Sequence, residues 1–149
     1  MPQLSMHSPV GDITVSEDEG KIVSLDWGWG MTQEKTPLLL KAKGQLEAYF
    51  DGALKKFTLP LRPPGTLFSR HVWAEMRRIP YGKILTYGEL AFLVENHPRA
   101  VGQVCASNPI PIIIPCHRVL GAKETLGGYS GEGGLATKCD LLRLEGFLL

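Results

Sequence analysis

Apolar and polar residues alternate along the first part of the chain in a way that predicts short β-strands. A strand pattern begins at Met6, is interrupted at 9–12 and resumes over 13–15. The polar stretch 17–20 ends in glycine and is typical of a hairpin turn, and residues 21–27 continue the alternation beyond it. Apolar residues at every second position of 57–61 predict a last strand.

Helical spacing replaces this alternation in three longer stretches. Residues 38–50 follow Thr36-Pro37, a capping residue with proline at the first helical position. A second helix is predicted over 66–79, with Thr66 as its cap and apolar residues along one face. The pattern at the end of the chain predicts a helix over 135–144. The segment before residue 62 therefore reads as a small α+β unit, and the segment after it as mainly helical.

Two short helices are predicted between these longer ones. Thr86 and Glu89 form a capping box, in which each side chain satisfies a backbone N–H of the other. A helix follows to about Val94, and Pro98 is suited to the first position of another helix over 99–107. Two short helices joined by a tight turn are typical of a helix-turn-helix, which favours DNA binding without establishing it.

Composition and length fit this division of the chain. The 149 residues are 44% hydrophobic, enough for one domain or two small ones with real cores. Pro and Gly at 62–65 form a stiff connector, so we expect an N-terminal domain over 1–61, a linker over 62–65 and a second domain over 66–149. The net charge of +1 says nothing about nucleic acid by itself, and the charge distribution gives the second half a mild basic bias but no polybasic surface.

Cysteine and histidine usage restricts the chemistry. The three cysteines are an odd number and widely spaced, which favours reduced thiols and a cytoplasmic location. There is no CxxC pair and the four histidines are scattered, so we expect no metal site. The sequence contains no long apolar run, and we expect no membrane association.

The most informative stretch runs from residue 109 to 119. Its three consecutive isoleucines, 112–114, predict buried, extended chain, and Pro115 ends regular pairing before Cys116. His117 and Arg118 follow directly. A thiol beside a base and a cation can become a reactive thiolate. The alternative is that Cys116 is simply a small buried hydrophobe.

Taken in order, these motifs resemble the O6-alkylguanine-DNA alkyltransferases, also called methylated-DNA–protein-cysteine methyltransferases. The resemblance covers residues 66–146 almost continuously and 1–60 only in outline, where the family has a ribonuclease-H-like α/β unit. The matching segments are Pro80-Tyr81-Gly82, Thr86-Tyr87-Gly88-Glu89-Leu90-Ala91, Arg99-Ala100-Val101-Gly102, Asn108-Pro109, Ile114-Pro115-Cys116-His117-Arg118-Val119, Gly128-Tyr129-Ser130-Gly131 and Lys138 to Gly146.

The resemblance implies a single-turnover reaction on a nucleotide flipped out of the duplex. Cys116 would accept the alkyl group, with His117 acting through a water as base and Glu145 orienting His117. Tyr87 would donate a proton or a strong hydrogen bond to the departing guanine. No cofactor is implied. We expect a monomer acting on double-stranded DNA that carries O6-alkylguanine, and also on O4-alkylthymine.

The DNA contacts and the pocket are implied in the same way. Arg99 would enter the base stack while its helix lies in the minor groove, together with Ala100, Gly102 and Gln103. The residues expected around the pocket are Asn108, Pro115, Val119, Tyr129, Ser130 and Lys138. The turn before Arg99 is shorter than in many relatives, and the loop up to Gly134 is longer.

Three other functions compete with this interpretation. A lesion sensor without transfer activity typically has tryptophan in place of the reactive cysteine, so Cys116 argues against it. A Cys-His hydrolase would need its histidine far from the cysteine in sequence, unlike His117. A transcription regulator would need a second binding or sensing domain, which 149 residues do not provide.

Overall fold

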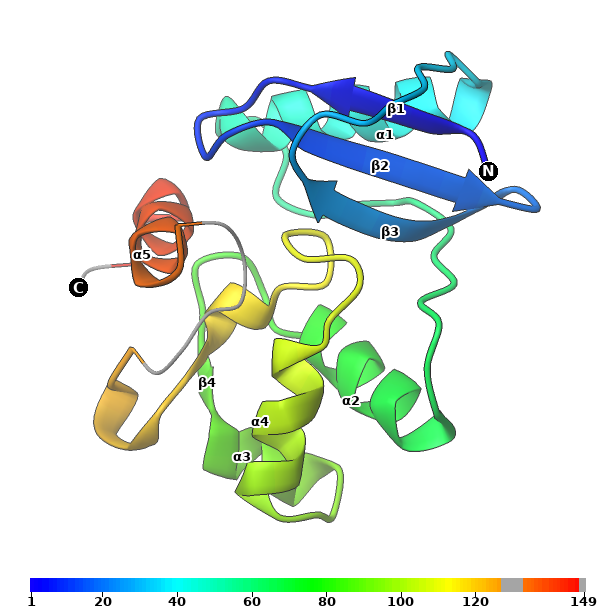
Figure 1. Cartoon of the computed structure of the whole chain (residues 1–149). Coiled ribbons are helices and arrows are strands. Elements are labelled where there is room, and N and C mark those ends of the chain that lie inside the picture. Colours follow the sequence, from blue (N-terminus) through cyan, green and yellow to red (C-terminus); the bar gives the residue numbers. More distant parts are fainter. Residues whose placement is uncertain (127–132, 148–149) are drawn as a thin grey trace. The chain divides into compact units, whose positions relative to one another are not determined.

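The computed structural model describes residues 1–126 and 133–147, and the chain divides into two compact units, Met1–Pro64 and Gly65–Leu149 (Figure 1). In the first unit, β1 (Gln3–Met6), β2 (Ile13–Asp18) and β3 (Lys21–Trp27) form an antiparallel sheet in the order β1-β2-β3. The predicted hairpin is confirmed, because β2 and β3 pair directly across it.

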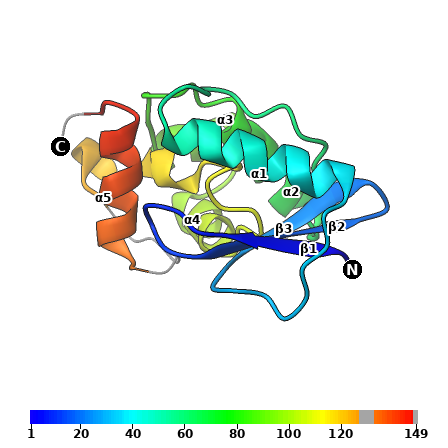
Figure 2. The ribbon, with the colours of Figure 1, turned by 90° about the horizontal axis from the view of Figure 1, so that it is seen from above.

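Helix α1 (Pro37–Phe50) covers one face of this sheet, where it packs against β1 and β2 (Figures 1 and 2). The predicted cap is confirmed: the hydroxyl of Thr36 accepts a hydrogen bond from the N–H of Leu39 at 3.1 Å. The core between them consists of apolar side chains on the facing surfaces of helix and sheet, including Leu4, Met6, Ile13, Val15, Leu25, Leu39, Ala42, Leu46 and Tyr49.

The strand predicted over 57–61 is wrong. Only Leu61 makes a bridge, to Ile22, with backbone hydrogen bonds from Ile22 N–H to the Pro60 oxygen and from Arg62 N–H to the Ile22 oxygen. Pro60 lies within this segment and two prolines follow Arg62, and these residues have no N–H to extend a ladder. Alternation in sequence therefore gave one bridge and no strand.

The second unit is built on three helices, α2 (Leu67–Arg77), α3 (Tyr87–Leu93) and α4 (Pro98–Ala106), which pack on one another. Thr66 caps α2 and the capping box at Thr86 is present, as predicted. The indole N–H of Trp73 in α2 donates to the Val104 oxygen in α4 at 3.0 Å. Helix α2 therefore packs against both helices of the predicted pair, α3 and α4.

The rest of this unit brings distant segments together. β4 (Leu85–Thr86) pairs in parallel with β5 (Val119–Leu120). The 3-10 turn η1 (Cys116–Arg118) lies directly before β5, while α3 starts directly after β4. In this parallel register the start of α3 lies beside β5, and η1 lies beside the segment that leads into β4. The unit is completed by η2 (Ala122–Glu124) and α5 (Leu135–Leu144).

The predicted fold class, a small α+β unit followed by a mainly helical domain, is confirmed. Within the described residues, no helix combines the length and apolar character needed to cross a membrane.

Candidate active site

The segment before Cys116 is buried as predicted, but it is not extended. Residues 110–114 form a turn closed by a hydrogen bond from Ile114 N–H to the Ile110 oxygen at 2.9 Å. Ile112 at its tip has φ of 73°, a left-handed conformation that is unusual for a β-branched residue. A run of buried isoleucines is compatible with both a buried strand and a buried turn, so the pattern alone predicted the wrong backbone conformation.

The side chain of Asn108 joins the two ends of this turn. Its Nδ2 donates to the Ile114 oxygen at 2.8 Å, and its Oδ1 accepts from the N–H of Ile110 at 2.9 Å. The N–H of Cys116 donates to the same Ile114 oxygen at 2.8 Å. The side chain of Asn108 thus fixes the backbone directly before η1.

Cys116 opens η1 and its side chain is buried. Burial raises the pKa of the Cys116 thiol, while a hydrogen bond from Asn108 and the charge of Lys138 act in the opposite direction. The thiol is therefore protonated at rest, and forming the thiolate requires a group that takes its proton.

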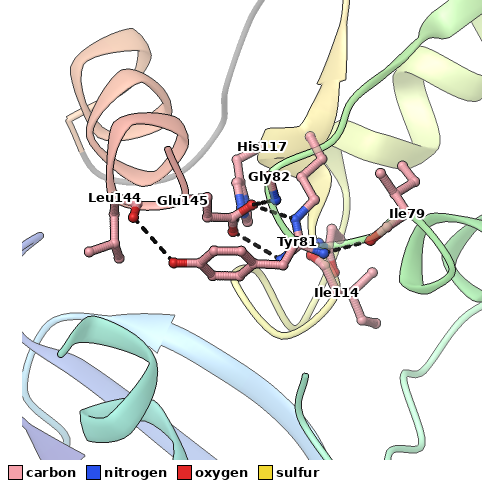
Figure 3. A network of polar contacts seen from close by, with 9 residues as sticks. Ile79, Tyr81, Gly82, Ile114, His117, Leu144 and Glu145 are labelled. Carbon is pink, nitrogen blue, oxygen red and sulfur yellow. Dashed lines mark hydrogen bonds and ion pairs between the residues drawn. The ribbon is translucent and has the colours of Figure 1, made fainter. Parts of the chain in front are cut away.

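That group can be His117, whose side chain has no solvent exposure. Its Nε2 lies 2.7 Å from Oε2 of Glu145, and Figure 3 shows the two side chains facing one another. Burial alone would raise the pKa of Glu145, but hydrogen bonds from His117 and Arg118 outweigh it and hold that pKa well below its usual range. Since Glu145 is a carboxylate, it accepts from Nε2, which therefore carries the imidazole proton.

The other ring nitrogen of His117 is then free to act as a base. Among the described residues, Nδ1 is the one buried side-chain nitrogen or oxygen without a hydrogen-bond partner. Burial lowers the pKa of His117, although its hydrogen bond to Glu145 opposes this. The imidazole is thus neutral near pH 7, with its acceptor nitrogen available.

Arg118 and Gly82 also donate hydrogen bonds to the Glu145 carboxylate. Arg118 donates to both of its oxygens, from Nε to Oε1 at 2.8 Å and from Nη2 to Oε2 at 2.9 Å, and its Nη1 donates to the Ile79 oxygen at 2.6 Å. The N–H of Gly82 donates to Oε1 at 3.1 Å (Figure 3). The bidentate pairing of Arg118 with Glu145 fixes the plane of the carboxylate, and the carboxylate in turn orients the ring of His117.

The Pro80-Tyr81-Gly82 turn also holds the end of α5. The hydroxyl of Tyr81 donates to the Leu144 oxygen at 3.2 Å, and its ring lies 5.9 Å from the guanidinium carbon of Arg118. Gly82 has φ of 77°, and a Cβ built on it would lie 3.1 Å from the Glu145 backbone oxygen. Glycine at this position therefore permits both the turn and its close approach to Glu145.

Tyr87 and Lys138 also lie close enough to the thiol to interact with it electrostatically. Tyr87 is the first residue of α3, and Nζ of the buried Lys138 lies 5.9 Å from the centroid of its ring. Burial, followed by the nearby Cys105 and Cys116, raises the pKa of Tyr87 to about 12. Nζ of Lys138 also donates to the Val119 oxygen at 2.8 Å. Tyr87 therefore keeps its proton and can donate it in a hydrogen bond.

The residues expected to contact DNA lie along α4. Arg99 and Gln103 are exposed, while Ala100 and Gly102 are half-buried. A Cβ built on Gly102 would meet no atom within 4 Å, so the surface there is open. The opposite face of α4 is packed through Val101, Val104 and Cys105. Of the residues expected around the pocket, Pro115 and Val119 are buried, whereas Tyr129 and Ser130 lie outside the described residues.

Two family models match nearly the whole chain. The DNA binding domain of 6-O-methylguanine DNA methyltransferase matches residues 67–147, and its ribonuclease-like domain matches residues 4–63. The chain belongs to the 6-O-methylguanine DNA methyltransferase family. The resemblance expected from the sequence motifs is thereby confirmed.

Individual relatives of this methyltransferase family agree in length as well as sequence. The methylated-DNA–protein-cysteine methyltransferase of Haemophilus influenzae is 41% identical over 93% of this chain and 82% of its own length. The constitutive enzyme of that name from Bacillus subtilis is 41% identical over 93% of this chain and 91% of its own. Mycobacterium tuberculosis OGT in complex with DNA has a TM-score of 0.88 at 36% identity, covering 97% of this chain and 92% of that one.

The sequence motifs of this family did not reveal how Arg118 is used. Arg118 was expected to lie beside the thiol as a cation, but its guanidinium is bound to Glu145, 27 positions further along the chain. The backbone donor at Gly82 was not expected at all. Within the described residues there is no group of His, Cys, Asp or Glu side chains that could hold a metal ion.

Proposed function

We propose that this protein repairs DNA by direct reversal, moving the alkyl group of O6-alkylguanine irreversibly onto Cys116. The observation that carries the proposal is the pairing of a buried thiol with the next residue, His117, whose Nε2 is held by Glu145 and whose Nδ1 lacks a partner among the described residues. A nucleophile, a base and a group that orients the base are what covalent group transfer requires.

The first step is proton removal from Cys116. The thiol proton passes to Nδ1 of His117 through a bridging water, and the carboxylate of Glu145 stabilises the imidazolium that forms. The charge of Lys138 favours the thiolate, since it lowers the pKa of the Cys116 thiol against the effect of burial. Arg118 keeps Glu145 ionised and in place throughout.

The thiolate then attacks the alkyl carbon. A carbon–sulfur bond forms as the carbon–O6 bond breaks, and the electron pair remains with the guanine. Tyr87, whose phenol is protonated, gives its proton to the departing base and is reprotonated by the proton that His117 took from the thiol, so that overall the thiol proton replaces the alkyl group on guanine. The thioether is not hydrolysed, so each molecule acts once. O4-alkylthymine presents an equivalent alkyl–oxygen bond and is included in the proposal.

The alkyl carbon is out of reach of a buried thiol while the base is stacked, so the nucleotide must be flipped out of the duplex. Arg99, exposed at the start of α4, enters the stack in its place. The small residues Ala100 and Gly102 let α4 approach the minor groove closely, a mode that depends on shape and backbone contacts and little on sequence. The protein acts in this way as a monomer in the cytoplasm.

The deciding experiment is the intact mass of the protein after incubation with a short duplex containing O6-methylguanine. We expect a gain of one methyl group, located on Cys116, and no gain for Cys116→Ser. Cys139→Ser, which removes a half-buried cysteine of α5, is the matched control and should still be methylated.

The same measurement distinguishes alkyl transfer from the second candidate function, lesion sensing. Binding to the duplex without any gain of mass would favour a lesion sensor that recruits other repair proteins. Repeated turnover, with more than one lesion repaired per protein molecule, would refute the irreversible transfer.

The role of Arg99 has its own test. Arg99→Ala should slow repair of the duplex much more than reaction with the free base O6-benzylguanine, which needs no flipping. Gln103→Ala, further along the same exposed face, should have a smaller effect. An equal loss on both substrates would contradict a role of Arg99 in extruding the base.

A further inference from the structure

The turn between α3 and α4 consists of two helix caps placed back to back (Figure 1). At the end of α3, the N–H of Asn96 donates to the Ala91 oxygen at 3.0 Å and the N–H of Glu95 donates to the Phe92 oxygen at 3.3 Å. Glu95 has φ of 54°, so it occupies the left-handed position that glycine usually fills at a helix end. The chain therefore leaves α3 in one defined direction.

The cap of α4 follows directly, at Asn96 and His97. The side-chain Oδ1 of Asn96 accepts from the N–H of His97 at 2.7 Å. The imidazole Nδ1 of His97 then accepts from the backbone N–H of Arg99 at 3.0 Å, and Pro98 occupies the first position of α4. His97 is thus the N-cap of the helix, a position where Ser, Thr, Asp and Asn are the usual residues.

Arg99 is the second residue of α4, where a positive charge is electrostatically unfavourable. The N-terminus of a helix carries a partial positive charge, and the first turn of α4 contains no acidic residue that would offset Arg99. A cation at this point does not stabilise the helix. Its position is therefore maintained by the cap, which binds the backbone N–H of Arg99 itself.

We propose that His97 is a positioning residue for Arg99: by capping α4 through the Arg99 amide, its imidazole fixes where the guanidinium leaves the helix toward the duplex. This rests on the proposed function, in which Arg99 replaces the flipped base. Each residue of this short turn is restrained, Glu95, Asn96 and His97 by hydrogen bonds and Pro98 by its position in the first turn of α4. A change in the cap should therefore shift the start of α4.

The test compares His97→Ala, which removes the acceptor, with His97→Asn, which restores one of the best capping groups. Each full-length variant reacts with an O6-methylguanine duplex and with free O6-benzylguanine. Loss of the cap should slow the duplex reaction roughly fivefold, the factor that corresponds to a typical capping contribution, and leave the free-base reaction unchanged. His97→Asn should recover most of the duplex rate. His71→Ala, an exposed histidine of α2, is the matched control and should behave as wild type.

Hydrogen exchange at the Arg99 amide gives a second readout, which should be faster in His97→Ala and protected in wild type and His97→Asn. The proposal is overturned if His97→Ala repairs the duplex at the wild-type rate, if both substrates slow equally, or if asparagine fails to rescue. Failure of the proposed function is distinct from these results, because wild-type protein would then gain no methyl group at all.

Discussion

Two histidines of the second unit, His117 and His97, have opposite surroundings and use their ring nitrogens in opposite ways. His117 is fully buried, donates from Nε2 to Glu145 and leaves Nδ1 without a partner among the described residues. His97 is exposed and accepts a backbone N–H at Nδ1. The ring of His117 is fixed by a charged side chain, whereas the ring of His97 fixes the backbone of α4.

This difference separates what each region contributes. We call His117, Arg118, Glu145 and Gly82 the glutamate cluster, and 95–98 the helix turn. The glutamate cluster is a buried ion pair, Arg118 and Glu145, with the polar groups that bond to it, and an unmatched group in such a place is costly. The helix turn consists of caps in contact with water, where a capping hydrogen bond contributes about 1 kcal/mol. Substitutions in the cluster should therefore affect folding and chemistry together, and those in the turn mainly the geometry presented to DNA.

The largest effect is expected from Arg118→Met, which keeps side-chain volume but removes the guanidinium. It leaves the buried carboxylate of Glu145 with hydrogen bonds only from His117 and Gly82 among the contacts described above. The free energy of unfolding should fall by about 3 kcal/mol, as for other broken buried ion pairs. Urea denaturation measures this, and methyl transfer should slow in parallel because His117 loses its fixed partner.

The matched control is Arg143→Met. Arg143 pairs with Asp140 at 3.8 Å, and its side chain is 66% exposed. Exposed pairs of this kind contribute about 0.5 kcal/mol or less. If both substitutions cost the same, burial is not what distinguishes the glutamate cluster.

A smaller effect in the same cluster is expected from Gly82→Ala. The new Cβ would lie 3.1 Å from the Glu145 backbone oxygen and would be held at φ of 77°, a conformation that costs a residue with a side chain about 1–2 kcal/mol. Gly88→Ala, at an ordinary φ in α3 with the nearest atom 3.9 Å away, should instead stabilise slightly. Thermal unfolding of the two variants should therefore shift in opposite directions.

The pH dependence of stability should also reveal the buried histidine. Burial lowers the pKa of His117, so below about pH 6.5 the unfolded chain binds a proton that the folded protein does not. The stability that His117 contributes is complete above that pH and declines as the pH falls toward its folded pKa. Glu145 acts in a lower window, because its pKa is depressed and its contribution is lost only at more acid pH.

The measurement is the urea midpoint of wild type and His117→Gln across the range from neutral to mildly acid pH. Wild type should lose stability more steeply than the variant just below about pH 6.5. Equal slopes would mean that the imidazole is accessible to protons in the folded protein, and would contradict its assignment to the glutamate cluster.

The comparison also explains which parts of the molecule the sequence could predict. The caps at Thr36, Thr66 and Thr86 are formed by residues a few positions apart, so the sequence alone reveals them. The helix turn was located for the same reason. The isoleucine run was placed correctly in the core but assigned the wrong backbone, because Asn108 supplies hydrogen bonds that a strand partner would otherwise provide.

Long-range pairing accounts for the rest. The bond between Arg118 and Glu145 joins residues 27 positions apart, and the donor at Gly82 comes from 63 positions away. No periodicity encodes such contacts. Family resemblance supplied the roles expected for His117 and Glu145, but only the folded chain shows that Arg118 shares the carboxylate with His117.

The smallest effect, and the one that isolates the helix turn, is expected from Glu95→Gly. Glu95 has φ of 54° at the end of α3, where glycine carries no steric cost, so this substitution should stabilise the protein by about 0.5–1 kcal/mol. Glu19→Gly is the matched control, since Glu19 also has a positive φ, of 49°, but forms an ion pair with Arg62 at 3.3 Å. Its gain should be smaller by the contribution of that exposed pair, a few tenths of a kcal/mol. Thermal unfolding without DNA measures both, and a loss of stability in Glu95→Gly would show that the carboxylate, and not the backbone, holds the turn.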